Sequence, residues 1–173
     1  MESVWKTVLW QQFGASIDMF GNAIRSCPEN LWEESLWQDP SMGPEFSAFW
    51  YVTYHTLFFL DLYLSGAVEG FAPPAPFTLG ELDPAGVLPD RVYTPSELLD
   101  YLAQIRQKCQ TTIETLTDER ANQLCHFPWG EMPFAGLLLD NMRHVQEHGA
   151  QLNLFLGQQA SLNARWITKL KPQ

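Results

Sequence analysis

Apolar side chains recur with a helical period along four long stretches of the chain. The first covers residues 2–26, and Cys27-Pro28 ends it because the residue before a proline is pushed out of the α conformation. The second covers residues 44–65, is apolar on nearly every side and closes at Gly66. A helix that is apolar all round is a buried one, so this second stretch predicts the central helix of the fold.

The third and fourth helices have clearer boundaries. Thr94-Pro95-Ser96-Glu97 is a capping box with proline at the first helical position, and an apolar stripe continues from it to Leu116. A loop over residues 125–133 follows, and the fourth helix runs from Phe134 to residue 157 or 159. Residues 161–173 form a short tail for which Trp166 is the expected anchor.

The segments between these helices predict irregular structure. Residues 66–93 contain five prolines and four glycines, which exclude a helix and indicate a crossover between the second and third helices. Residues 30–37 fit one or two helical turns, and residues 39–44 form a loop. Because strand alternation never exceeds a few residues, we predict an all-α protein, a four-helix bundle in a single domain spanning residues 1–173.

Composition and charge narrow the classes of function. Hydrophobic residues make up 46% of the chain, which excludes intrinsic disorder as a description of the whole. Ten basic residues against 20 acidic ones give a net charge of −10, and such a chain repels phosphate backbones. We therefore expect no nucleic-acid partner.

The cysteines and the apolar stretches bear on the compartment. Three scattered cysteines make no disulfide framework and fit a reducing environment. Residues 46–64 are apolar enough to suggest a membrane span, but His55 and Asp61 interrupt them. The N-terminus lacks the basic region of a secretory signal. The expectation is a soluble, cytoplasmic protein without a membrane partner.

Candidate chemistry is concentrated on the fourth helix. His144 and His148 are four residues apart, so both imidazoles project from one helical face and can reach a single ion. They lie where an apolar stripe meets a polar one that contains Asp140, Glu147 and Gln151. A metal site at the mouth of a bundle needs such a border. Three interpretations of Asp140 stay open: a fourth ligand, a group that holds an imidazole, or an exposed carboxylate with no role at the site.

His55 extends the pair to a predicted triad. It lies in the middle of the second helix, so three of the four histidines face the bundle. Three neutral imidazoles with open positions are typical of a catalytic metal site rather than a closed structural one. We predict one divalent ion bound by His55, His144 and His148; zinc, nickel, iron and cobalt all suit these ligands.

These residues resemble the DinB/YfiT-like metalloenzyme superfamily. The resemblance rests on His144-x-x-x-His148 with Gly149 and Gln151 after it, on the Pro-Trp-Gly loop before this helix and on the single histidine of the second helix. It covers residues 2–156; Gly149-Ala150 stands where the family often has Arg-Gly. It implies a four-helix bundle with one divalent ion on three histidines, a homodimer, and thiol-dependent transferase or isomerase activity.

The chemistry of the ion has alternatives. The leading hypothesis is a transferase whose low-molecular-weight thiol binds the ion as thiolate and attacks a small-molecule electrophile, with Asp140, Glu147 or Gln151 orienting the nucleophile. The same site would serve a hydrolase that uses metal-bound water, or a non-enzymatic, stress-related metal-binding module. His144-x-x-Glu147-His148 also matches an inverted zinc-peptidase motif, although no third carboxylate ligand is apparent downstream.

Two further features carry weaker hypotheses. Cys125 and His126 are adjacent and would make a nucleophile pair, although neighbouring residues rarely face each other. Leu139 and Leu154 lie outside the apolar stripe of the fourth helix and favour a homodimer contact.

Overall fold

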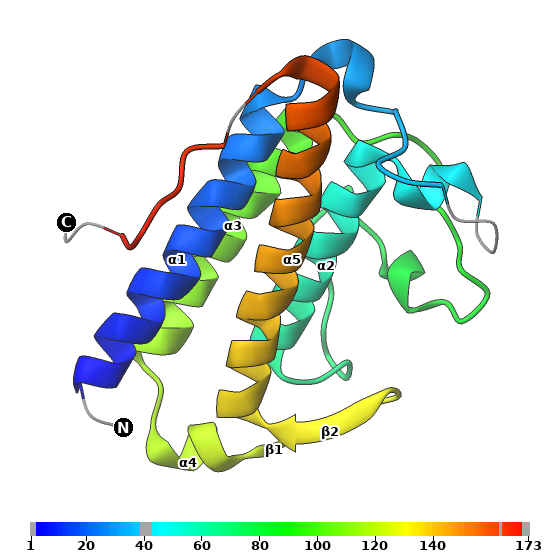
Figure 1. Ribbon diagram of the computed structural model, residues 1–173. Helices are drawn as coiled ribbons and strands as arrows, with labels where there is room; N and C mark the ends of the chain where they lie inside the picture. Colours follow the sequence, from blue (N-terminus) through cyan, green and yellow to red (C-terminus); the bar gives the residue numbers. More distant parts are fainter. Residues whose placement is uncertain (1–2, 39–42, 163, 171–173) are drawn as a thin grey trace.

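Four long helices form a bundle in the computed structural model, which describes residues 3–38, 43–162 and 164–170 (Figure 1). They are α1 (Ser3–Ser26), α2 (Phe49–Ser65), α3 (Pro95–Glu114) and α5 (Phe134–Ala160). The predicted helical fold is therefore confirmed. Residues 2 and 39–42, which the sequence assigned to the first helix and to a loop, lie outside the described residues.

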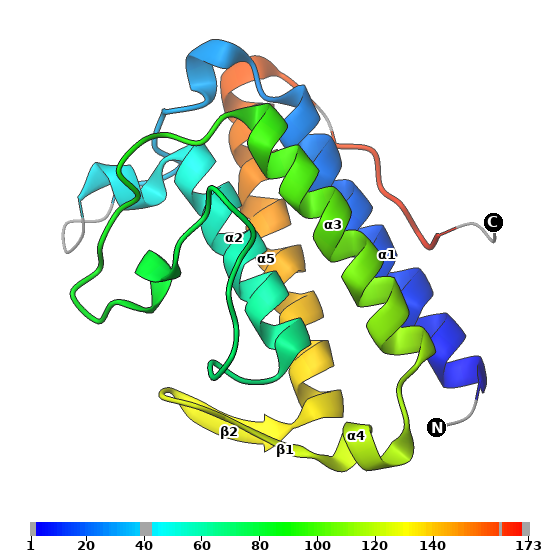
Figure 2. The ribbon, with the colours of Figure 1, turned by 180° about the vertical axis from the view of Figure 1, so that it is seen from behind.

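The direction of the helices explains the long crossover. Figures 1 and 2 show α1 and α5 running in one direction and α2 and α3 running in the other. α1 packs against α3 and α5, and α2 packs against the same two helices. Because α2 and α3 run in the same direction, the chain must return along the length of the bundle between them, and residues 66–93 make this return.

α2 is the most deeply buried helix, as its composition predicts. Thirteen of its 17 residues are buried, and the remaining four are His55, Phe59, Tyr63 and Ser65. The first three are spaced four residues apart and share one side of the helix. Gly66 ends α2 in the left-handed conformation at φ 81°, and its N–H donates to the carbonyls of Leu62 and Tyr63.

Three predicted segments need correction. The helix expected from residue 44 begins at Phe49, because Ala48 is extended and bridges Ser35; only a 3-10 turn, Pro44–Ser47, precedes it. The turns expected over residues 30–37 reduce to the 3-10 turn Glu29–Leu31. The crossover contains a 3-10 turn, Leu79–Leu82.

The loop predicted over residues 125–133 is a β-hairpin. β1 (Leu124–Phe127) pairs antiparallel with β2 (Gly130–Pro133), and Pro128 and Trp129 form the tip. Strands of four residues are too short to show a period of two, so the pattern left no signal. A short helix, α4 (Asp118–Asn122), precedes the hairpin and was also missed, although Thr117 accepts a hydrogen bond from Arg120 N–H as its N-cap.

Aromatic contacts fasten the crossover to the bundle. The ring of Phe77 stacks on Tyr101 of α3, with centroids 4.5 Å apart, and on Tyr54 of α2 at 5.8 Å. Tyr93 packs edge-on against Phe77 at 4.8 Å. These contacts hold the crossover against both helices that it joins. Because Glu81 lies between Phe77 and Tyr93 in the sequence, the contacts also fix where Glu81 lies in the fold.

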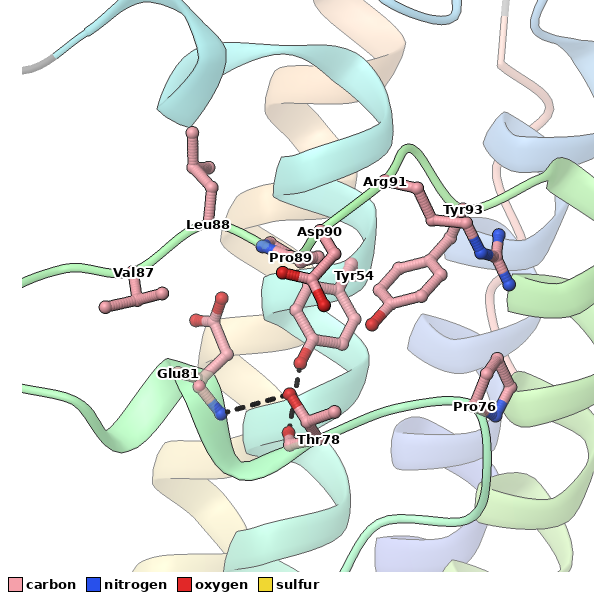
Figure 3. A pocket seen from close by; sticks show the side chains of 11 residues that line it. Tyr54, Pro76, Thr78, Glu81, Val87, Leu88, Pro89, Asp90, Arg91 and Tyr93 are labelled. Carbon is pink, nitrogen blue, oxygen red and sulfur yellow. Dashed lines mark hydrogen bonds between the residues drawn. The ribbon is translucent and has the colours of Figure 1, made fainter.

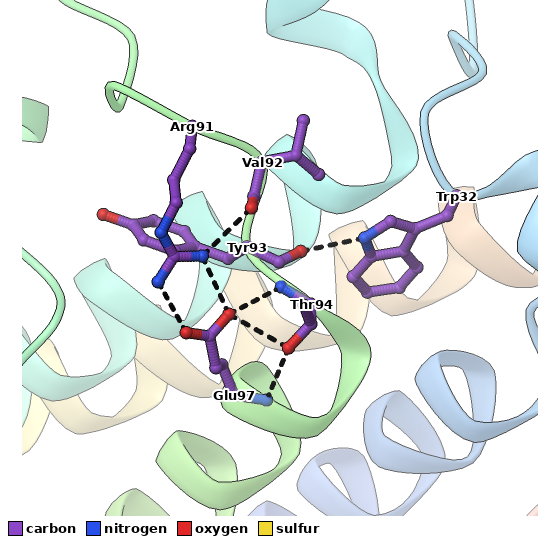
Figure 4. Close-up of polar contacts among 6 residues, drawn as sticks. All are labelled: Trp32, Arg91, Val92, Tyr93, Thr94 and Glu97. Carbon is purple, nitrogen blue, oxygen red and sulfur yellow. Dashed lines mark hydrogen bonds and ion pairs between the residues drawn. The ribbon is translucent and has the colours of Figure 1, made fainter.

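The predicted capping box at the start of α3 is present (Figure 4). Thr94 Oγ1 accepts from the Glu97 N–H, and the Glu97 carboxylate accepts from the Thr94 N–H. Arg91 donates to both Glu97 oxygens, at 3.0 and 2.6 Å, and with Thr94 it lowers the pKa of Glu97 to about 2. Trp32 Nε1 donates to the Tyr93 carbonyl at 2.9 Å, so the end of the crossover is fixed.

The C-terminal tail runs beside α1, but its anchor differs from the expected one. Trp166 is 67% exposed. The tail is held instead by the Leu170 N–H, which donates to the Gln11 carbonyl, and by Gln12 Nε2, which donates to the Thr168 carbonyl. Among the described residues, none of the helices combines the length and the apolar character that crossing a membrane requires.

A buried ion pair joins α2 to α3 and gives a stability prediction. Lys108 Nζ donates to Asp61 Oδ1 and to Ser65 Oγ, and Tyr101 donates to Asp61 Oδ2 at 2.9 Å. Lys108→Met leaves the Asp61 charge buried, and we expect the free energy of unfolding in urea to fall by about 2–3 kcal/mol. This is below the cost of breaking a fully buried pair, because the Lys108 side chain is 36% exposed.

Lys6→Met is the matched control for this variant. Lys6 Nζ donates to an exposed carbonyl, that of Glu114, and surface substitutions of this kind change stability by about 0.5 kcal/mol or less. Equal losses for the two variants would contradict the assigned role of the Asp61 network.

Candidate metal centre

Three imidazoles meet between α2 and α5. His55 comes from α2, and His144 and His148 come from successive turns of α5. Their ring centroids lie 5.4 Å (His55 to His144), 5.3 Å (His55 to His148) and 4.6 Å (His144 to His148) apart. One ligand atom from each residue lies within 4.8 Å of the others, so this group could hold a metal ion. The fourth histidine, His126, lies in the hairpin.

Two of the three rings are oriented by hydrogen bonds at Nδ1. His55 Nδ1 lies 2.8 Å from Glu81 Oε2, and His148 Nδ1 lies 2.7 Å from Gln151 Oε1. A carboxylate acceptor fixes the proton of the neutral ring on Nδ1, as the amide oxygen does for His148, and leaves the Nε2 lone pair free. His144 Nδ1 is buried and has no hydrogen-bond partner among the described residues.

The surroundings of His144 and His148 favour their neutral forms. Burial, followed by the charges of His148 and His55, lowers the pKa of His144 to about 3. Burial and the charge of His55 also lower the pKa of His148, opposed by the Gln151 hydrogen bond and by Glu147. Metal ions bind the neutral form of histidine, so these donors fit a divalent transition metal at neutral pH.

The low pKa of His144 predicts acid sensitivity of the metal-free protein. The unfolded chain binds a proton at this ring below about pH 6.5, while the folded chain does so only near pH 3. Between these values the free energy of unfolding therefore falls as the pH falls, by up to about 1.4 kcal/mol per pH unit. Urea denaturation of the protein and of His144→Gln isolates this contribution; the same slope in both between pH 6 and 4 would refute it.

The three polar residues predicted beside the histidines have different surroundings. Gln151 accepts from His148 and orients its ring. Asp140 is half-buried and accepts a hydrogen bond from Arg143 at 3.3 Å. Burial raises the pKa of Tyr63, and the charge of Asp140 raises it further. Glu147 is exposed and lines a groove toward α1 with Trp166, although its charge reaches His148. Catalytic roles for Asp140 and Glu147 stay predictions.

Sequence reasoning missed Glu81. It lies in the irregular crossover, 26 residues from His55, and only 3% of its side chain is exposed. Its Oε1 is buried, and no described group completes a hydrogen bond to it. Burial, with the nearby Glu81 charge, raises the pKa of Tyr51. The available signal was one acidic residue in Leu79-Gly80-Glu81-Leu82, within the irregular crossover.

Glu81 also contributes to the wall of a cavity on the other side of the crossover. The cavity has a volume of about 370 Å³ and lies between α2 and residues 76–93. Figure 3 shows Leu88 and Glu81 on the left of this view, Tyr54 near its centre and Tyr93 on the right. Glu81 therefore stands between this cavity and the histidine cluster.

The hairpin separates Cys125 from His126. Cys125 is buried, whereas His126 lies on the opposite, exposed face, 2.9 Å from Glu131 on the paired strand. Burial raises the pKa of the Cys125 thiol, with a smaller opposing effect of Arg120, so the thiol stays protonated at neutral pH. The two residues do not form the nucleophile pair considered from the sequence.

Aromatic rings cover the end of the cluster near the hairpin. Phe59 lies 4.8 Å from the His55 ring and 6.0 Å from the His144 ring, and Tyr63 lies 6.4 Å from His144. Trp129, at the tip of the hairpin, packs edge-on against Phe59 at 5.8 Å. The tip of the hairpin therefore packs against the ring that contacts two of the three histidines.

Comparison with known families agrees with this geometry. The family model described as DinB superfamily matches residues 12–152, which include all three histidines, the whole of α2 and most of α5. Comparisons with curated proteins and with solved structures gave no significant match.

Proposed function

We propose, from the premise that the chain belongs to the DinB superfamily, that it is a metal-dependent enzyme of the thiol-transferase kind. Its ligands are His55, His144 and His148, and its ion is zinc, nickel, iron or cobalt. The observation that carries the proposal is the convergence of three imidazoles with Nδ1 of two rings already engaged. Three protein ligands leave open positions, which a catalytic centre needs and a closed structural site lacks.

The bound ion supplies a Lewis acid that keeps a thiol deprotonated at neutral pH. Glu81 and Gln151 hold the rings of His55 and His148 in the orientation that presents Nε2. Asp140 and Glu147 are proposed to orient the thiol and to accept its proton. The charge of Asp140 raises the pKa of Tyr63, and the charge of Glu147 opposes the lowering of the pKa of His148. The transfer forms a carbon–sulfur bond and expels the leaving group of the electrophile.

Cobalt substitution tests the thiol step. Low-molecular-weight thiol added in the millimolar range should change the visible spectrum of the cobalt protein, because sulfur enters an open position. Ethylene glycol, the dialcohol counterpart of mercaptoethanol, is the matched control and should leave the spectrum as it was. A spectrum that no thiol alters would refute the transferase and leave the hydrolase, which uses water at the same position.

We also propose a cytoplasmic homodimer. Leu139 and Leu154 of α5 are 51% and 63% exposed, which supports a contact with a second copy. The three cysteines are free, which supports a reducing compartment. Sedimentation at high micromolar concentration should give the mass of two chains, and Leu154→Glu should shift it toward one; monomeric behaviour of the unaltered protein would refute the dimer.

A further inference from the structure

Four aromatic side chains form a continuous surface beside the histidines, which we term the aromatic shelf: Phe59, Tyr63, Phe127 and Trp129. Phe127 and Trp129 stack with centroids 5.3 Å apart and planes inclined by 17°. Tyr63 packs against Phe127 at 5.4 Å and lies 6.4 Å from Trp129. Through Phe59 the shelf reaches the ring of His55.

The aromatic shelf is accessible to solvent, whereas most of α2 is buried. Trp129 is 52% exposed, and Phe59, Tyr63 and Phe127 are partly exposed. On α2 the residues that are not buried are the stripe His55, Phe59 and Tyr63, together with Ser65 at its end. The stripe spans nine residues, a rise of about 12 Å along the helix, and leads from the hairpin to a predicted metal ligand.

Stabilising the hairpin does not account for this arrangement. A two-residue hairpin tip favours glycine or asparagine, whereas this tip carries a tryptophan that remains half exposed. Trp129 keeps about half of its surface exposed although it packs against Phe59, Tyr63 and Phe127. The exposed part of Trp129 and its neighbours instead offers flat, electron-rich faces, on which an electron-poor planar ring stacks favourably.

We propose that the aromatic shelf binds a planar, π-conjugated part of the substrate and places it beside the histidine cluster. The inference rests on the proposed function, because it assigns the substrate class of that enzyme. A conjugated electrophile is also the kind of carbon centre that a thiolate attacks. Trp129 is the specificity-determining residue, since it contributes the largest exposed ring of the shelf and packs on Phe59, which in turn contacts the His55 ring.

The test uses nitrobenzene and its saturated counterpart, nitrocyclohexane, as probes of matched size. Affinity is measured by equilibrium dialysis of the full chain, with and without metal, and the indole N–H resonances in nuclear magnetic resonance spectra of the unaltered protein report where the probe binds. We expect nitrobenzene to shift the Trp129 resonance and to bind about tenfold more tightly than nitrocyclohexane, in both states. Trp129→Leu should weaken nitrobenzene binding about tenfold, whereas Trp129→Phe, which keeps a ring, should retain most of it.

Trp166→Leu is the control, because Trp166 is 67% exposed and lies on the tail beside α1. It should leave nitrobenzene binding unchanged. Equal affinity for the two probes, or binding unaffected by Trp129→Leu in a protein with an unaltered circular dichroism spectrum, would overturn the inference. Because nitrobenzene binding is also measured on the metal-free protein, the result for the aromatic shelf does not depend on whether the proposed metal site is correct.

Discussion

Alanine at His55, His144 or His148 is expected to lower the affinity for a divalent ion more than 100-fold. Loss of a ligand exceeds loss of a residue that merely orients one, which costs about 10–100-fold. Each substitution leaves two imidazoles, too few to retain an ion against solvent and buffer. Titration of metal-free protein with zinc, read by calorimetry, measures the loss directly.

His126→Ala supplies the matched control. His126 also makes a 2.9 Å contact with a glutamate, but it lies in the hairpin, outside the cluster. This variant should bind zinc as the unaltered protein does. If His55→Ala retained full affinity, His55 would be a core residue hydrogen-bonded to Glu81 and the triad would be wrong.

Removal of the Glu81 carboxylate is expected to have the second largest effect. Glu81→Ala takes away the acceptor that fixes His55, and removing a group that holds a metal ligand in place lowers metal affinity about 10–100-fold. Glu81→Gln keeps an oxygen acceptor and should recover part of the loss. The same calorimetric titration applies, with the spectrum of the cobalt-loaded protein reporting whether ligand geometry has changed.

Glu131→Gln tests whether any glutamate–histidine contact matters equally. It alters the Glu131–His126 pair, which has nearly the same length as the Glu81–His55 contact but lies on the surface. We expect no change in zinc affinity. If Glu131→Gln and Glu81→Gln lowered the zinc affinity equally, Glu81 would act only through its negative charge and not through its contact with His55.

The bundle was predictable because its signals are periodic and repeated. Apolar spacing over 20 or more residues identified α1 and α5, and a capping box marked the start of α3. Boundaries set by tertiary contacts were not predictable: α2 begins five residues late because Ala48 pairs with Ser35. The hairpin escaped notice because each of its strands is one four-residue segment.

The residues of the candidate site likewise divide into those that a local sequence pattern predicts and one that depends on tertiary contacts. His144 and His148 share a helical face, and His55 stood out as a polar residue on an apolar helix, so the sequence alone predicted all three. Gln151 was predicted beside them because it belongs to the polar stripe of the same helix. Glu81 did not, because its position depends on how the crossover folds against α2 through Phe77, and no local pattern encodes that contact.

Metal content of the protein purified without an affinity tag tests the central claim most directly. Elemental analysis after dialysis, followed by titration of the stripped protein, should give one divalent transition-metal ion per chain, and His55→Ala should give almost none. A protein that takes up no ion, or a His55→Ala variant that still carries one ion per chain, would contradict the account.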